Sequence, residues 1–488
     1  MMQKILSASE IAKLDQIHLK RKGFSNHAFM ELVAQRFVDW FQSQGHSFEV
    51  KILVCVGAGN NGGDGLAIAR ILFTLGYPIE VATCFSPGAK LSPDCQQNLA
   101  LLPSQIHCHT LGNTILSNDG ILIDAYLGVG CSGPLREEAK QRVQTMNSFA
   151  GTIIALDLPS GLPADSILSG GAVKAELTVT LGFPKLSLLL PEHAEYTGEL
   201  VVLDIGFDEE EFNDFPDQTY FLQEKDVLPL HRKFHRFAHK GDFGKVLLVA
   251  GSRGKMGAAV LAAKASFRTG SGLVTCLIPE EERGALSAVP EAMCIFDEDQ
   301  DFSAYDAIGM GPGLGLDQGD RLKKILSATR KPVVLDADAL NCLAKDPSIW
   351  ALIPKGSILT PHLKEFDRLF GTPTSHLERM AKAKACCLTY GINLVLKGAN
   401  SLCSLEDGRK VFNSSGSKYM ATAGMGDALT GILTSFLGQG YSPENAVLCG
   451  VFHHGLAGEL AGEHNLRGTM VQDLIEAIPE TYRLIGLD

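Results

Sequence analysis

The sequence predicts an α/β protein with two domains, each built around a mostly parallel β-sheet. Short apolar stretches typical of buried strands alternate with longer stretches of helical periodicity, which is the pattern of strands joined by crossover helices. Glycine is also in excess, with 51 residues where average usage predicts roughly 34. Many of these glycines directly follow the apolar stretches, at positions where α/β proteins hold phosphate groups.

The length and composition narrow the class of protein. The 488 residues are enough for two domains with independent cores. The net charge of −12 argues against nucleic acid as the main partner. The 12 cysteines are scattered and include no CxxC pair, which is typical of a reduced protein without a disulfide framework or zinc site. The chain shows neither a signal peptide nor an apolar run long enough for a membrane helix, so we expect a cytoplasmic protein.

The first domain is predicted to begin with two helices. A capping box from Ser7 to Glu10 indicates the start of one helix, and apolar residues at helical spacing over 29–41 indicate the other. Short apolar strands of a parallel sheet are then expected at 51–56, 79–85, 121–124, 152–158, 177–181 and 200–205.

A linker is predicted between about 207 and 242, where the apolar periodicity lapses and an acidic stretch gives way to a basic one. We therefore expect domains at 1–220 and 221–488. Strands of the second domain are predicted at 245–250, 273–279, 307–310, 332–336, 357–360 and 394–397. Asp407 and Gly408 then predict a hairpin between strands 401–405 and 410–413.

The first predicted strand runs into a glycine-rich segment, 57–65, that formally matches GxGxxG. Glu80 stands where the ribose-binding acid of a dinucleotide fold would follow. A pyrophosphate loop does not need the polar side chains of Asn60, Asn61 and Asp64. Such oxygen donors suit a monovalent or hard cation, or a polyhydroxyl ligand. A glycine turn without special chemistry is the remaining alternative.

Two further strands of the first domain end in Asp124 and Asp157. The carboxyl ends of parallel strands share one edge of a sheet, so both aspartates are expected near the glycine-rich segment. A strand-end aspartate is more often a helix cap, but three polar loops at one edge favour a site. Ser160 lacks the G-x-S-x-G context of a hydrolase nucleophile, which argues against that class.

The second domain carries a glycine-rich helix start that ends in Asp427. Backbone amides there can hold a transferring phosphate while Asp427 takes a proton from an acceptor hydroxyl. An ordinary aspartate cap is the alternative. No P-loop motif is present, and the adjacent His453 and His454 are more typical of helix packing than of a metal site. Supporting polar loops hold residues 311–315, Asp336, Asp338, His362, Glu365 and Lys397.

These motifs resemble two known families. Segments 59–65, 123–124, 128–134, 157–161 and 182–206 are similar to NAD(P)H-hydrate epimerases, which implies a Rossmann-like three-layer domain. Segments 239–245, 311–315, 336–340, 360–362, 397–398 and 423–427 resemble the nucleotide-dependent NAD(P)H-hydrate dehydratases, which implies a ribokinase-like α/β domain. The fused order is that of the bacterial bifunctional nicotinamide-nucleotide repair enzymes. Met425, where many relatives have Thr or Ser, and Gln35, where Gly is common, depart from the pattern.

For the second domain, the resemblance implies dehydration of hydrated NADH and NADPH. The hydroxyl on C6 of the S form would be phosphorylated from ADP, with magnesium, and phosphate would then be eliminated to leave NAD(P)H and AMP. Asp427 would be the catalytic base. The hydrate would contact Ala258, Gly313, His362 and Asp427, and the nucleotide would contact Lys397, Gly398, Ala399, Asn400, Ser401 and Gly426.

For the first domain, the resemblance implies interconversion of the R and S hydrates, with Asp157 as the catalytic residue. Asn61, Asp124 and Ser160 would bind potassium. The hydrate would contact Asn60, Asn61, Gly62, Gly63, Asp64, Gly128, Val129, Gly130, Cys131, Ser132, Gly133, Pro134 and Asp157. A homo-oligomer with small-molecule substrates and no nucleic-acid or membrane partner is expected.

Two alternatives remain open. One is a small-alcohol kinase fused to a Rossmann-type dehydrogenase, although a hydride enzyme would not need Asn60, Asn61 and Asp64. The other is a repair dehydratase whose first domain is a non-catalytic binding module. The presence of Asp124, Asp157 and Ser160 counts against that module.

Overall fold

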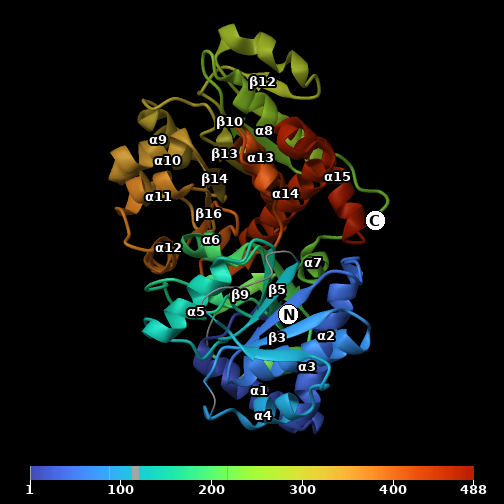
Figure 1. Ribbon diagram of the computed structural model, residues 1–488. Coiled ribbons are helices and arrows are strands. Elements are labelled where there is room, and N and C mark those ends of the chain that lie inside the picture. The colour runs from blue at the N-terminus through green and yellow to red at the C-terminus, as the bar shows by residue number, and fades with distance from the viewer. Residues whose placement is uncertain (1, 87, 113–119, 217, 488) are drawn as a thin grey trace. The chain divides into compact units, whose positions relative to one another are not determined.

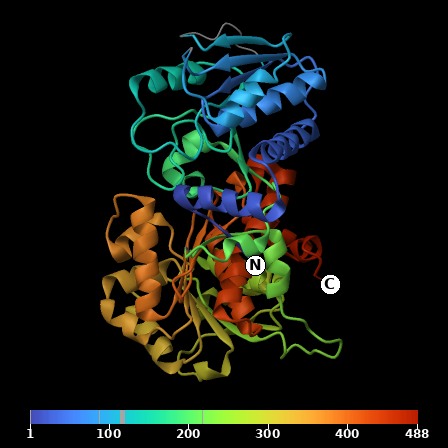
Figure 2. The same ribbon diagram turned by 90° about the horizontal axis from the view of Figure 1, so that it is seen from below.

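The computed structural model describes residues 2–86, 88–112, 120–216 and 218–487. The chain forms two compact units, Gln3–Asp217 and Gln218–Asp488, and each has its own sheet and core (Figure 1). Both α/β units have helices on both faces of the sheet (Figures 1 and 2). Among the described helices, none has the length and apolar character needed to span a bilayer.

The first unit holds a seven-stranded parallel sheet of order β4-β3-β2-β5-β6-β7-β8. Its strands are β2 (Ile52–Val56), β3 (Ile79–Thr83), β4 (His107–Thr110), β5 (Ile121–Ala125), β6 (Thr152–Leu156), β7 (Leu177–Leu181) and β8 (Glu199–Leu203). The short β1 (Gln3–Lys4) precedes them in the chain and is not part of this sheet. The chain moves outward from β2 through β3 to β4 and then returns to β5 on the other side of β2. The carboxyl ends of β2 and β5 therefore mark a topological switch point, where open α/β sheets bind ligands.

The helices of the first unit are α1 (Ala8–Lys22), α2 (Asn26–Ser43), α3 (Asn60–Thr74), α4 (Pro93–Ala100), α5 (Glu137–Asn147) and α6 (Ala194–Thr197). Helices α2 and α3 pack on one face of the sheet with residues such as Phe37 and Leu72, and α5 covers the other with Val143 and Met146. The predicted capping box starts α1, where the Ser7 amide donates to Glu10 at 2.9 Å.

The sequence did not predict β4. β4 is the edge strand of the sheet, and its side chains are mostly exposed. Its four residues, His107 to Thr110, therefore lack the run of aliphatic side chains by which the other strands were predicted. The other strands of this sheet match their predicted positions, although β3, β6 and β8 end two residues earlier than predicted.

The second unit is built on ten strands in the order β9-β18-β17-β16-β15-β14-β13-β10-β11-β12. Strand β17 is antiparallel to both neighbours, as the predicted hairpin requires, and the other pairs are parallel. The strands are β9 (Thr219–Leu222), β10 (Lys245–Val249), β11 (Leu273–Leu277), β12 (Met293–Ile295), β13 (Ala307–Met310), β14 (Val333–Leu335), β15 (Ile358–Leu359), β16 (Asn393–Leu396), β17 (Leu402–Ser404) and β18 (Lys410–Asn413).

Helices enclose this sheet from both sides (Figures 1 and 2). The helices are α7 (Glu224–Val227), α8 (Met256–Arg268), α9 (Gly319–Ala328), α10 (Asp338–Lys345), α11 (Leu363–Phe370), α12 (His376–Tyr390), α13 (Met425–Gly438), α14 (Pro443–Asn465) and α15 (Val471–Leu484). One core joins the sheet to α8, α13, α14 and α15, and a second joins its other face to α9, α10 and α12.

The predicted linker over 207–242 is wrong from residue 218 onward. Strand β9 pairs in parallel with β18, with Phe221 opposite Phe412, and Phe221 and Leu222 are buried. The change of charge correctly indicated that the two units divide in this region. The four residues of β9 are too few to show the apolar pattern of a strand between charged segments. Residues from 218 onward therefore belong to the second unit rather than to a connection.

Candidate active sites

The glycine-rich segment of the first unit is a tight turn between β2 and α3. A Cβ at Gly57 would lie 1.8 Å from the carbonyl oxygen of Tyr126, and one at Gly62 would lie 1.9 Å from that of Gly57. Both positions therefore require glycine for close backbone packing. Helix α3 begins at Asn60, earlier than predicted, so Asn61 and Asp64 project from its first turns at the switch point.

The three residues predicted to bind potassium lie in one hydrogen-bonded cluster. The Ser160 hydroxyl donates to Asp124 Oδ1 at 2.6 Å, and the Ser160 amide donates to Oδ2 at 2.7 Å. The side-chain amide of Asn61 donates to the Leu127 carbonyl at 3.1 Å, and the Leu127 amide donates to Ser160 Oγ at 2.7 Å. Asp124 and Ser160 are both fully buried. The strand ends thus gather carboxylate, hydroxyl and amide oxygens in one place.

The charge of Asp124 fits a cation at this cluster. Burial raises the pKa of Asp124 to about 6, although hydrogen bonds from Ser160 and Tyr126 oppose that rise. Within the described ranges, no Lys, Arg or His forms an ion pair with this carboxylate. A buried carboxylate without a basic partner is costly unless a cation or a proton neutralises it. The surrounding donors are oxygens, which suit potassium better than a soft metal.

Asp157 is held in an unusual backbone conformation at the end of β6. Its φ of 68° lies in the left-handed region, which a non-glycine residue adopts only at a cost. Its Oδ1 accepts from the buried ammonium of Lys185, from the Leu181 amide at 3.1 Å and from the Thr180 hydroxyl at 3.3 Å. Lys185 is only 2% exposed. The structure therefore aims this carboxylate at a fixed position and pairs it with a buried lysine.

Two further carboxyl groups interact with Asp157. Burial raises the pKa of Asp15 to about 6, with Lys185 lowering it and Asp157 raising it. The pKa of Asp64 is well above its usual value because of burial, and the charges of Asp157 and Asp15 add to that rise. Carboxyl groups with different pKa values beside an ammonium can hold and move protons. Neither Asp15 nor Lys185 was predicted as a site residue, although Lys185 lies in segment 182–206, which carries the family resemblance.

The segment 128–134 lies next to the cluster of Asn61, Asp124 and Ser160, since a Cβ on Gly128 would be 3.1 Å from the Asn61 Cβ. Its residues are exposed or half-buried, which leaves them accessible to a ligand. Glu80, by contrast, lies near the amino end of β3. It is therefore at the wrong end of its strand for a ribose-binding acid, and that alternative is wrong for this structure.

In the second unit, Asp427 lies in the first turn of α13, as predicted. Gly424 precedes the helix with a φ of 92°, which favours glycine. A Cβ on Gly426 would lie 3.4 Å from both Asp336 Oδ2 and Lys397 Nζ, so the helix start is beside that ion pair. Burial raises the pKa of Asp427 to about 6; Asp336 adds to that rise and Lys397 opposes it.

Lys397 is oriented by a buried carboxylate. Its Nζ is 2.7 Å from Asp336 Oδ1, and the Thr430 hydroxyl donates to Asp336 Oδ2 at 3.0 Å. The Asp336 side chain is 2% exposed, whereas that of Lys397 is 21% exposed. The lysine can therefore reach a ligand while its partner stays in the core. Ala337, the next residue, has a φ of 50°, which is a second strained non-glycine position at a strand end.

The other predicted contacts of the second unit fall into two groups. The backbones of His362 and Lys397 form a β-bridge. The Nδ1 of His362 accepts from the Lys364 amide at 3.1 Å, and its Nε2 takes no part in that hydrogen bond. Gly313 and Ala258 form the second group, because a Cβ on Gly313 would lie 3.1 Å from the Ala258 Cβ. The segment 397–401, predicted to contact the nucleotide, is the turn between β16 and β17, where Ser401 Oγ donates to the Gly398 carbonyl at 3.1 Å.

The paired histidines take part in packing, as the sequence indicated. His453 is buried in α14, with Nε2 at 2.9 Å from His231 Nε2 and Nδ1 at 2.6 Å from the Thr481 hydroxyl. Burial lowers the pKa of His453 to about 3 and that of His231 to about 4. His454 Nε2 lies 2.9 Å from the Met425 carbonyl, beneath the start of α13.

Comparison with known families covers both units. The family described as YjeF-related protein N-terminus matches residues 26–187, and the family described as NAD(P)H-hydrate dehydratase matches residues 246–480. Among solved structures, a ribokinase-like superfamily protein from Enterococcus faecalis V583 is 26% identical, with a TM-score of 0.51 over 57% of this chain and 99% of that chain. An ADP/ATP-dependent NAD(P)H-hydrate dehydratase from Bacillus subtilis, co-crystallised with ATP/Mg²⁺, is 29% identical with a TM-score of 0.49, covering 54% of this chain and 97% of its own.

The fold and sites define a two-part α/β enzyme whose second unit is ribokinase-like. Two proteins named bifunctional NAD(P)H-hydrate repair enzyme Nnr align along nearly the whole chain. The one from Moorella thermoacetica is 32% identical over 98% of this chain and 96% of its own length, and the one from Coxiella burnetii is 36% identical over 92% and 91%. The chain belongs to the family of bifunctional NAD(P)H-hydrate repair enzymes.

Family membership confirms the predicted resemblance, fold class and type of enzyme. The protein combines an epimerase domain with an NAD(P)H-hydrate dehydratase domain for nicotinamide-nucleotide repair. The alternative of a small-alcohol kinase fused to a dehydrogenase is therefore wrong. The roles of individual site residues stay predictions.

Proposed function

We propose that residues 1–220 interconvert the R and S hydrates of NADH and NADPH, and that residues 221–488 dehydrate the S form at the expense of ADP. The observation that carries the proposal is that each unit has its own core and its own set of polar loops at the carboxyl edge of its sheet. Neither proposed site uses a residue of the other unit. Division of labour between the two units follows from that separation.

The dehydration needs a better leaving group than hydroxide. The C6 hydroxyl gives its proton to Asp427 as its oxygen bonds to the β-phosphorus of ADP, and the bond to AMP breaks. Phosphate then leaves C6 while a proton leaves C5, which restores the double bond of NAD(P)H. With its pKa at about 6, Asp427 is ionised at neutral pH and can act as the base. Lys397, held by Asp336, and the amides at the start of α13 stabilise the transferring phosphoryl group.

Magnesium bound with ADP would neutralise phosphate charge. In such sites magnesium is held mainly by the substrate phosphates with one or two carboxylates. Asp427 fits this role, since it lies in the first turn of α13 next to Gly426, a proposed nucleotide contact. The segment 397–401 and Gly426 would contact the nucleotide, and His362, Gly313 and Ala258 would contact the hydrate.

The epimerisation needs an acid–base group that assists inversion of C6 without a nucleotide. Removing the proton of the C6 hydroxyl and giving one to N1 opens the C6–N1 bond to an aldehyde, and reversal of this step on either face gives both epimers. Asp157 fits this role because its carboxylate is fixed by Lys185, and its charge adds to the raised pKa values of the buried Asp15 and Asp64. Asn60–Asp64 and the accessible segment 128–134 would contact the hydrate. Asn61, Asp124 and Ser160 would hold potassium, which would supply a fixed positive charge next to that segment.

An assay of the full-length protein with mixed hydrates tests the proposal. With ADP, magnesium and potassium, both epimers are expected to disappear and reduced-nicotinamide absorbance to recover fully. Without nucleotide, the epimers should equilibrate and no absorbance should return. If the R hydrate is never consumed faster than it epimerises spontaneously, the first unit is a non-catalytic binding module. A preference for ATP over ADP would overturn the assigned donor.

Two wider predictions are separate from this chemistry. We infer a homo-oligomer, which light scattering of the purified protein tests. We also expect the protein in the cytoplasm, which fractionation of its source cells tests.

A further inference from the structure

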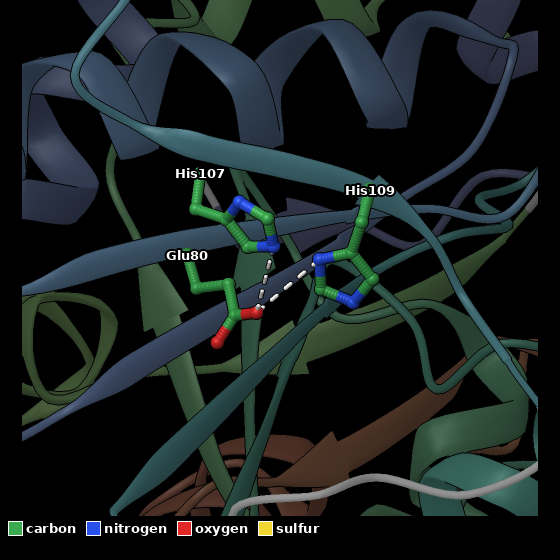
Figure 3. Close-up of side chains that lie close together, drawn as sticks. All are labelled: Glu80, His107 and His109. Carbon is green, nitrogen blue, oxygen red and sulfur yellow. Dashed lines mark ion pairs between the residues drawn. The ribbon is translucent and has the colours of Figure 1, made fainter.

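We infer that Glu80, His107 and His109 form a binding site for a divalent transition-metal ion, with zinc as the expected occupant. Glu80 Oε1 is 3.2 Å from His109 Nδ1 and 3.9 Å from His107 Nε2. One ligand atom from each of the three residues lies within 4.8 Å of the other two. Figure 3 shows the two imidazole rings and the carboxylate turned toward one another.

The backbone brings these side chains together before any ion binds. Strands β3 and β4 are parallel, with Glu80 opposite His107. Side chains alternate along a strand, so His107 and His109 share a face and Cys108 between them points to the other. The two rings stack with centroids 5.2 Å apart. The pairing of β3 with the edge strand therefore sets the spacing of the donors.

The donor set favours a metal of borderline softness. Two imidazole nitrogens and one carboxylate oxygen are ligands of zinc, with bonds of about 2.0–2.2 Å and a water in the fourth position. Tetrahedral geometry then separates the donors by about 3.4 Å, between the two measured distances of 3.2 and 3.9 Å. Small side-chain rotations complete the geometry. The proposed potassium cluster has only oxygen donors, so the two sites select different ions.

The local hydrogen bonding also favours a ligand. His109 Nδ1 is shielded from solvent and has no partner with hydrogen-bond geometry, although Glu80 is close to it. A shielded polar atom without a partner is unfavourable, and a metal ion would satisfy it. Glu80 lies near the amino end of β3, whereas the proposed epimerase site is at the carboxyl edge of the sheet. The ion would join the edge strand to its neighbour and stabilise the sheet rather than act on the hydrate.

The test uses full-length protein freed of metal by a chelator and then titrated with zinc chloride against a chromophoric zinc chelator. We expect one equivalent of zinc per chain with micromolar affinity, and a rise of a few degrees in the unfolding temperature of the first unit. The epimerisation rate should not change. Absence of a one-equivalent site would overturn the inference.

Single substitutions identify the ligands. His107→Ala and His109→Ala should each weaken zinc binding by at least about tenfold, and Glu80→Gln, which preserves the shape of the side chain, should do the same if an alanine variant fails to fold. The matched control is His239→Ala, since exposed His239 pairs with Asp242 at 3.1 Å. Cys108→Ser should retain full binding. Loss of binding in Cys108→Ser, or normal binding in both histidine variants, would sink the proposed ligand set.

Discussion

The two proposed active sites place a carboxylate beside a lysine in opposite ways. In the first unit, the strained residue is Asp157 itself, and its partner Lys185 is 2% exposed. In the second, the strained residue is Ala337, the carboxylate of the preceding Asp336 is buried, and the Lys397 side chain is 21% exposed. In the first site the lysine is therefore the buried support and the carboxylate can face substrate. In the second site the carboxylate is the support and the lysine can face substrate.

This difference matches the two chemistries. Inversion at C6 needs a positioned acid–base group, whereas phosphoryl transfer needs a positioned cation and a separate base. In the proposed second site the base would come from another element, as Asp427 on α13. Backbone strain at both strand ends indicates that these turns are held by their surroundings to aim side chains.

The largest expected effect separates the two sites completely. Asp427→Asn should lower dehydration by about 10²–10⁴-fold and leave epimerisation unchanged, because it removes only the base of the second site. Single-turnover assays with S hydrate and ADP measure the loss. Asp317→Asn, a change at a 96% exposed side chain, is the control. More than about a tenth of normal dehydration in Asp427→Asn would contradict the role of this residue.

Asp157→Asn should have the converse effect. We expect epimerisation to fall by about 10²-fold while the S hydrate is still repaired at the normal rate, so about half of a fresh equal mixture remains. Lys185→Met should give the same pattern, since it removes the partner that fixes Asp157. Thermal unfolding must show that each variant is folded. Equal loss of both activities would break the division between the sites.

Asp124→Ala tests the cation of the first site. Removing a buried carboxylate ligand should weaken the potassium response of epimerisation by at least about tenfold, with dehydration unaffected. The measurement is the epimerisation rate over a potassium titration, with sodium keeping the ionic strength constant. An unchanged response would place the cation elsewhere.

The pH dependence sharpens the comparison further. Burial raises the pKa of Asp427 to about 6, and the base must be ionised to accept a proton. Dehydration at saturating substrate should therefore be level above about pH 7 and fall about tenfold per unit well below pH 6. Rates measured under brief exposure to acid check this. A rate that rises as the pH falls through 6 would show that Asp427 acts in its protonated form.

The smallest expected effect concerns strain. Ala337→Gly should raise the unfolding free energy of the second unit by about 1 kcal/mol, because glycine adopts positive φ without cost. Ala385→Gly, at an exposed position inside α12, should lower it by about 0.5–1 kcal/mol. Denaturant titration of both variants gives the comparison. A stability loss in Ala337→Gly as large as that in Ala385→Gly would show that Ala337 is not strained.

Local sequence patterns were enough to predict most of the sheet and the loops that carry the sites. Buried strands such as β5 and β10 are short runs of mostly apolar residues, so each can be predicted without knowing which strands pair with it. The glycine-rich turn, the strand-end aspartates and the helix start at Asp427 are also local, and their order along the chain carried the family resemblance. The polar edge strand β4 and the four-residue β9 have no such pattern, and only their pairing with β3 and β18 makes them strands.

Chemical pairings between distant residues required the tertiary structure. Lys397 and Asp336 are 61 residues apart, and Lys185 and Asp157 are 28 apart, so no spacing rule predicts either pair. The same holds for Asp15 on α1, whose pKa the charge of Asp157 helps to raise, and for Glu80, which faces two histidines rather than a ribose. The sequence by itself determined which elements form and which polar groups end them. Strand order and register decided which of those groups meet, because contacts across a sheet depend on the pairing of strands and not on local periodicity.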